Sequence, residues 1–223
     1  METNRIPAAL YRPMPSFRLG LLAAALFLLA EAPAPSATSE EAARVFAVSG
    51  ARTAAVQSYV SNLHVDFALL SFPYLKFHLD GKITYQRPNV YSVHFDHVPW
   101  FGKGFENIKA DALQPATWGE HYDIDKVAHD GDRTIVEMRD KTTGHVKGVR
   151  AELDTDGLRR IVWTYLNGGK IAVSIVPTTV SGAPVPASED ADIALPSYHV
   201  TAHATFTDYK IVTDAGTVAE RAR

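Results

Sequence analysis

Residues 81–98 constrain the fold more than any other stretch, because two alternating segments flank a tight turn. Successive side chains leave a pleated strand on opposite faces, so alternation of apolar and polar residues is typical of a strand with one apolar face. Between the two segments, Arg87-Pro88-Asn89 has the composition of a turn. The stretch is therefore predicted to form a β-hairpin. Its apolar face carries Ile83, Tyr85, Tyr91, Val93 and Phe95.

The same alternation recurs along the chain and predicts about nine strands joined by short turns, the spacing typical of an antiparallel sheet. Asn167-Gly168-Gly169 is the strongest turn signal, because such residues supply the positive φ that tight hairpins require. Strands do not alternate with helices, as they would in a parallel sheet. Besides the two arms of the hairpin, the first of which begins near Phe77, the predicted strands are Leu63–Leu69, Tyr122–Ala128, Arg133–Asp140, Val146–Asp154, Leu158–Leu166, Lys170–Thr179 and Tyr198–Val212.

A helix is predicted from Ser39 to about Tyr59. Ser39 can cap its N-terminus, and Glu40 and Glu41 lie where the helix dipole favours anions. Apolar residues follow at helical spacing, and this apolar stripe needs a partner surface, which we expect to be the sheet. The predicted fold class is thus mainly β: a strongly curved antiparallel sheet whose concave apolar face is covered by helices.

Three segments are predicted to lack regular strands. Residues 99–119 are rich in aromatic residues, and they either fold back over apolar surface as a lid or contain a short helix that does the same. Residues 181–196 are rich in Pro, Ala, Ser and acidic residues and predict a flexible loop. Residues 215–223 are expected to form a frayed tail. The lid candidates are Trp100, Phe101, Phe105 and Trp118.

Residues 1–37 are predicted to be a secretory signal peptide, and residues 38–214 the folded domain. Arginines precede the apolar run Leu19–Leu29, and small residues and prolines follow it. The run is well short of the roughly 20 apolar residues that span a bilayer, and an uncleaved membrane anchor is the alternative. The chain has no cysteine, so it carries neither disulfides nor a cysteine for a lipid anchor. We therefore expect an exported protein that is soluble after cleavage.

Composition and spacing argue against nucleic-acid and metal binding. The chain has 223 residues and a formal net charge of -3, without a cluster of Lys and Arg interleaved with aromatic residues, so nucleic acid is not an expected partner. His94 and His97 would lie on opposite faces of a strand. His199 and His203 would lie about 13 Å apart along one, at roughly 3.3 Å per residue. These histidines are therefore expected to face solvent, and no metal site is predicted.

No catalytic constellation is complete in the sequence. Glu120 and His121, followed by Asp123 and Asp125, have the residue types of an acid–base cluster. A nucleophile motif such as G-x-S-x-G does not accompany them, and neither a phosphate-binding loop nor a dinucleotide-binding fingerprint is present. We therefore expect a protein that is not an enzyme and uses no cofactor.

The apolar side of the predicted sheet is the remaining candidate site. A curved antiparallel sheet encloses volume on its concave face, and either side chains or a ligand must fill that volume. Alternation alone does not distinguish a binding cavity from ordinary core under a helix, so both interpretations stay open. The large residues predicted to line this face are Phe67, Phe77, Tyr85, Tyr91, Phe95, Trp163, Tyr165 and Phe206.

Two stretches of the chain resemble the LolA/LolB-like outer-membrane lipoprotein-sorting family. The hairpin sequence Gly81–Asn89 fits the pattern G-x-[IL]-x-[YF]-x-R-P-N, and the segment Ser197–Val212 is similar to the closing strand of the family. The order of the elements agrees over about residues 41–213, from an amphipathic helix through the hairpin to that closing strand.

The resemblance implies an unclosed β-barrel with helices over a hydrophobic interior that accommodates the acyl chains of a lipid or lipoprotein. The implied function is a soluble, monomeric periplasmic carrier that ferries this cargo to the outer envelope, with membrane donor and acceptor proteins as further partners. The missing acceptor cysteine excludes the membrane-anchored receptor variety, and Arg87, in the turn, does not fit the family's cavity-gating arginine. A non-transporting lipid-sensing or regulatory module on the same fold is the alternative.

Overall fold

The computed structural model describes residues 37–51, 56–71, 74–87, 90–98, 115–142, 144–214 and 216–219. All of them belong to one compact unit, Pro35–Arg223. The predicted signal peptide, apart from its last residue, lies outside the described residues. Among the described helices, none is long and apolar enough to cross a membrane.

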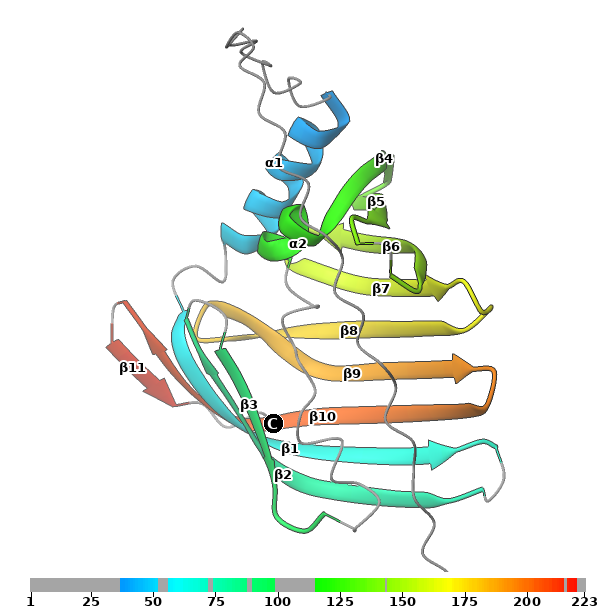
Figure 1. The fold of residues 1–223 in the computed structure, drawn as a ribbon. Coiled ribbons are helices and arrows are strands. Elements are labelled where there is room, and N and C mark those ends of the chain that lie inside the picture. Colours follow the sequence, from blue (N-terminus) through cyan, green and yellow to red (C-terminus); the bar gives the residue numbers. More distant parts are fainter. Residues whose placement is uncertain are drawn as a thin grey trace, which may run out of the picture. The chain divides into compact units, whose positions relative to one another are not determined.

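The fold is mainly β, as predicted: one antiparallel sheet with two short helices, α1 (Ala37–Ala51) and α2 (Pro115–His121). Ten strands follow one another in the order β3-β2-β1-β10-β9-β8-β7-β6-β5-β4, and β11 pairs with β10 beside this path (Figure 1). The strands are β1 (Val56–Leu69), β2 (Lys76–Gln86), β3 (Val90–Phe95), β4 (Tyr122–Asp130), β5 (Arg133–Asp140), β6 (Val146–Asp154), β7 (Gly157–Tyr165), β8 (Lys170–Val180), β9 (Ala183–Leu195), β10 (Tyr198–Thr213) and β11 (Gly216–Ala219).

The predicted hairpin of residues 81–98 is confirmed as β2 and β3, although part of its turn lies outside the described residues. Its register runs from Gly81 opposite Phe95 to Gln86 opposite Val90. Gly81 permits this close pairing, because a Cβ there would lie 2.2 Å from the carbonyl oxygen of His94. β5 and β6 also have the predicted bounds.

The predicted helix is too long at its C-terminal end. Helix α1 ends at Ala51, and β1 already begins at Val56, so Tyr59 lies in a strand. Tyr59 pairs with Tyr85 on β2 and with Ile211 on β10. The spacing of the apolar residues around Tyr59 fits a helix and a strand equally well. Pairing with both neighbouring strands decides in favour of the strand.

The loop predicted at residues 181–196 is wrong, because these residues contain β9 between β8 and β10. Prolines favoured the loop, since a proline cannot donate to the ladder of a central strand. Pro184 and Pro186 lie in the part of β9 that pairs with β8 but has no register with β10. The backbone N–H groups that these prolines lack are therefore missing from a part of β9 that pairs with a strand on one side only. In the expected C-terminal tail, β11 pairs with β10.

The sheet is unclosed, as expected, but it is not strongly curled, so the predicted strong curvature is wrong. Alternation specifies the face on which a side chain lies, whereas curvature depends on bulges and on how each face is packed. The apolar side chains form two separate clusters instead of one enclosed interior.

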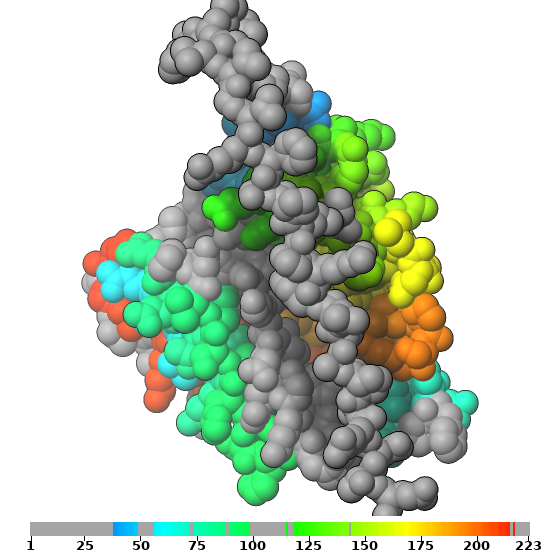
Figure 2. All heavy atoms as spheres, in the orientation of Figure 1, coloured from blue at the N-terminus to red at the C-terminus, as the bar shows by residue number. Residues whose placement is uncertain are grey.

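The first cluster lies mainly on β1, β2, β3 and β10, and we call this part the tyrosine half. The second lies on β4–β7 and on the helices, and we call it the helix-covered half. There α1 contacts α2 and strands β4, β6 and β7. In the space-filling view, the green residues of β3 and part of β2 lie on the left of the surface, and the yellow and orange residues of β8 and β9 lie on the right (Figure 2).

Candidate functional site

The eight residues predicted to line the apolar face fall into two groups. In the tyrosine half, Phe67, Tyr85, Phe95 and Phe206 are buried, while Phe77 and Tyr91 pack against them partly buried. Trp163 and Tyr165 belong to the helix-covered half. A row of paired residues crosses the sheet between the two groups: Phe77, Phe67, Ala202, Ala191, Val173 and Ile161. The eight residues therefore share one face without forming one cluster.

Of the four lid candidates, Trp100, Phe101 and Phe105 lie outside the described residues. Trp118 is fully buried on α2. Its ring meets that of Phe46 on α1 edge to face, with the ring centroids 5.4 Å apart. In this structure Trp118 is thus a packing residue between the two helices and the sheet.

The tyrosine half carries polar atoms on its apolar side. The rings of Tyr59, Tyr85, Tyr91 and Tyr209 form a chain of contacts, with neighbouring centroids 4.9–5.5 Å apart. Burial raises the pKa of Tyr59 and Tyr209 above the ordinary value, so both hydroxyls remain protonated donors. Tyr209 donates to the carbonyl oxygen of Pro186 at 2.6 Å. The fully buried Ser61 donates to the carbonyl oxygen of Thr207 at 2.7 Å.

At the edge of the first cluster, β9 and β10 present three alanines and one glutamate on the apolar face. We call Glu189, Ala191, Ala202 and Ala204 the central strip. Register places Ala202 opposite Phe67 and Ala204 opposite Val65, whose side chains are buried, yet every residue of the strip is partly exposed. The apolar face is therefore partly accessible along this strip.

Glu189 is the residue of this face that sequence analysis missed. It pairs with Ala204 on β10 and with Ile175 on β8, both apolar positions. Burial alone raises the pKa of its carboxyl group to about 7. The assignment of residues 181–196 to a loop concealed it. In a strand, one acidic residue in phase with Val185, Ala191 and Ile193 would have been the signal.

The opposite face of the sheet is polar and contains a pocket of about 690 Å³. A charged row crosses this pocket, since His78, Asp66, His203, Asp190, Ser174 and Arg160 are paired in turn from β2 to β7. His203 lies 2.6 Å from Asp190, and His199 lies 2.6 Å from Asp192. These two histidines thus form hydrogen bonds with aspartates on the polar face, which agrees with their predicted outward orientation.

His64 on the same polar face also contacts an aspartate, Asp80, at 2.6 Å, and that hydrogen bond raises the pKa of the histidine. Within the described ranges, no group of three His, Asp or Glu side chains is arranged to hold a metal ion. Among the four residues that have the residue types of an acid–base cluster, Asp125 forms an ion pair with Arg139.

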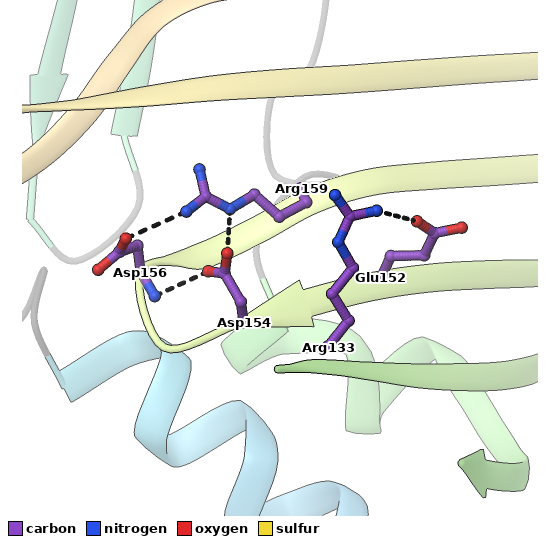
Figure 3. A network of polar contacts seen from close by, with 5 residues as sticks. All are labelled: Arg133, Glu152, Asp154, Asp156 and Arg159. Atoms are coloured by element: carbon purple, nitrogen blue, oxygen red, sulfur yellow. Dashed lines mark hydrogen bonds and ion pairs between the residues drawn. The ribbon is translucent and has the colours of Figure 1, made fainter. Parts of the chain in front are cut away.

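A second polar network lies at the turn between β6 and β7 (Figure 3). Arg159 bridges Asp154 and Asp156, and the backbone amide of Asp156 donates to Asp154 at 2.8 Å. Nearby, Arg133 contacts Glu152 at 3.5 Å. Each carboxylate in this network has a partner within it, so its arrangement is that of a braced turn.

No protein-family model matches this chain, and no curated protein matches it. Solved structures do match its fold. A domain from Vibrio parahaemolyticus named for outer membrane lipoprotein sorting has a TM-score of 0.57 at 7% identity, over 78% of this chain and 94% of that one. The fold is LolA-like.

Two further solved structures match over similar lengths. A DUF1329 family protein from Desulfovibrio piger has a TM-score of 0.53 at 8% identity, over 77% of this chain and 92% of that one. A LolA superfamily protein from Nitrosomonas europaea has a TM-score of 0.47 at 10% identity, over 75% and 92% of the two chains. At such identities the likeness concerns the fold, which agrees with the resemblance drawn from residues 81–89 and the closing strand.

Proposed function

We propose that this protein is a non-catalytic carrier, exported to the periplasm, that binds the acyl chains of a lipid or lipoprotein on the apolar face of its sheet. The observation that carries the proposal is the central strip: three alanines and a glutamate, all partly exposed, on an apolar face that carries two apolar clusters. The fold supports it, since a solved domain of the same fold is named for lipoprotein sorting.

In this proposal the chemistry of binding is burial of apolar surface. An acyl chain laid across the strip would contact aromatic side chains on either side, with Phe67 and Phe77 in the tyrosine half and Trp163 in the helix-covered half. Each methylene removed from water contributes about 0.8 kcal/mol, so burial of about ten methylenes of an acyl chain would contribute about 8 kcal/mol. No covalent step is required, and the cargo can leave unchanged.

The experiment is native mass spectrometry of the full chain, expressed with its own N-terminus and recovered from the periplasmic fraction without detergent. The mass reports both processing of the N-terminus and any bound lipid. A carrier is expected to retain an acyl lipid, which Ala202→Trp removes by filling the strip. Thr201→Trp, one position along β10 and on the polar face, is the matched control and should retain lipid.

A regulatory interaction module is the second candidate, favoured by exposed apolar side chains at adjoining strand ends. Leu70 and Tyr74, after β1, and Tyr198, at the start of β10, are 45%, 70% and 42% exposed. The amide of Leu70 donates to the carbonyl oxygen of His199 at 2.7 Å, so these ends are neighbours. Grouped apolar surface of this kind marks interaction sites. A protein that is lipid-free and ignores added lipid would favour this second function.

A further inference from the structure

Glu189 lies on the apolar face of the sheet, where both of its register partners are apolar. Its pairing with Ala204 and Ile175 puts its side chain on the apolar face, at the boundary between the two clusters. The residue keeps part of its surface accessible, while its carboxyl group lies deep among protein atoms. A carboxyl group in this position can contact a ligand that binds on the apolar face.

The described surroundings offer this carboxyl group no cation. The titratable groups that face it are tyrosines: Tyr59 on β1 and Tyr209 on β10, with Tyr91 on β3 next to them. The hydroxyl of Tyr209 already donates to Pro186. Within the described part of the chain, no ion pair to Glu189 is found, and burial alone accounts for its raised pKa.

An ionised carboxylate in apolar surroundings is costly unless a cation or several donors pair with it. The neighbouring Asp190 shows the contrast, because it points to the polar face and lies 2.6 Å from His203. Among its described neighbours, Glu189 has no such histidine or other basic partner. A ligand on the central strip could provide one.

We propose that Glu189 binds the ammonium group of an amine-bearing amphiphile whose hydrocarbon chain lies on the central strip. This inference rests on the proposed function and narrows its cargo to aminolipids. The carboxylate would accept charge-assisted hydrogen bonds from the ammonium group, which are about twice as strong as neutral ones. The apolar residues on either side would hold the chain.

The test compares two probes that differ in one group, decylammonium and decanol, by isothermal titration calorimetry with the full chain. At pH 8 the wild-type protein should bind decylammonium about tenfold more tightly than decanol, and this preference should shrink at pH 5.5 as Glu189 becomes protonated. Glu189→Gln should abolish the preference and leave decanol binding unchanged. Asp190→Asn, on the other face, should preserve it.

A second readout needs no variant. At pH 7 about half of the Glu189 carboxyl groups are protonated, given a pKa of about 7. Binding of decylammonium should therefore release about half a proton per site, measured by calorimetry in two buffers of different ionisation enthalpy, and decanol should release none. Equal binding of both probes, without proton release, would overturn the role of Glu189 and leave the carrier intact. Failure of both probes to bind would overturn the carrier as well.

Discussion

The two halves of the sheet pack their apolar faces in different ways. In the helix-covered half, α1 and α2 lie on the strands, and Ala42 and Trp118 are fully buried. There the indole N–H of Trp163 donates to the hydroxyl of Tyr122 at 3.2 Å, so the indole nitrogen has a partner within the cluster. The tyrosine half instead brings a chain of tyrosine rings and a buried serine to the apolar side, beside the carboxyl group of Glu189.

This difference distinguishes side chains that stabilise the fold, in the helix-covered half, from side chains that are available for binding, at the central strip. A core that is closed by helices gains its energy from burial and has no need of polar groups. Polar groups on an apolar face reduce that gain, and they are retained where they contact one another or a ligand. We therefore expect substitutions in the helix-covered half to act on stability and those at the central strip to act on binding.

The largest effect is expected from Trp118→Ala, which removes the side chain that joins both helices to the sheet. Truncation of a fully buried tryptophan creates a cavity and should lower the free energy of unfolding by about 3–5 kcal/mol. Urea denaturation followed by circular dichroism measures the loss. Val48→Ala, at an exposed position of α1, should change it by less than about 0.5 kcal/mol. A small effect of Trp118→Ala would mean that the helices contribute little to the core.

A smaller but still substantial effect is expected from Gly81→Ala in the tyrosine half. The added Cβ would lie 2.2 Å from the carbonyl oxygen of His94 and 2.8 Å from the Cα of Phe95, both backbone atoms of β3. The strands must move apart, and we expect a loss of about 2–3 kcal/mol in the same denaturation experiment.

Gly148→Ala is the matched control in the helix-covered half. There the nearest atom, the carbonyl oxygen of Met138, is 3.8 Å from the added Cβ, which is ordinary contact. Stability should stay within about 0.5 kcal/mol of the wild type. Equal losses for the two glycine variants would contradict a cost set by the close approach of β2 to β3, because chain entropy by itself favours alanine at both positions.

A further effect on stability is a pH dependence that originates at Glu189. Its pKa in the folded protein is about 7, above the ordinary 4.5, so between these values the folded state binds more protons than the unfolded state. Stability from this group is therefore lost as the pH rises through that window, by at most on the order of 3 kcal/mol. Glu189→Gln lacks this dependence and should gain on the wild type between pH 5 and pH 8.

Urea denaturation of both proteins at the two pH values measures the difference. His64 acts in the same direction, because its pKa is also raised and its stabilising contribution is lost as the pH rises. It is present in both proteins, so the comparison isolates Glu189. A difference that is equal at pH 5 and pH 8 would contradict the buried position of the carboxyl group.

Local patterns predicted the parts of the fold that local physics determines. Residues 81–98 form a hairpin with the predicted faces, because alternation and turn chemistry act over a few residues. The prediction that Tyr59 lies in a helix was wrong, because the environment of Tyr59 is set by Tyr85 and Ile211, which are distant in sequence. Six of the eight predicted residues of the apolar face meet in one cluster, and two belong to the other.

Glu189 was missed for a related reason. The prolines of β9 weaken the local pattern that would predict a strand. The structure shows how the strand accommodates them: Pro184 and Pro186 pair with β8 and have no register with β10. The division of the apolar face into two clusters could not be predicted either. It depends on where the helices pack, and alternation contains no information about that.

The pairing of β1 with β10 has a consequence for the order of folding. The register joins Val56 to Thr213 and Leu69 to Val200, so the ladder at the middle of the sheet unites the two ends of the folded unit. Contacts of such long sequence separation form late and slow the search for the native state. A chain that stops after β9 would leave β1 and β9 as open edges, which are prone to aggregation. The sheet can therefore be completed only after β10 has been synthesised.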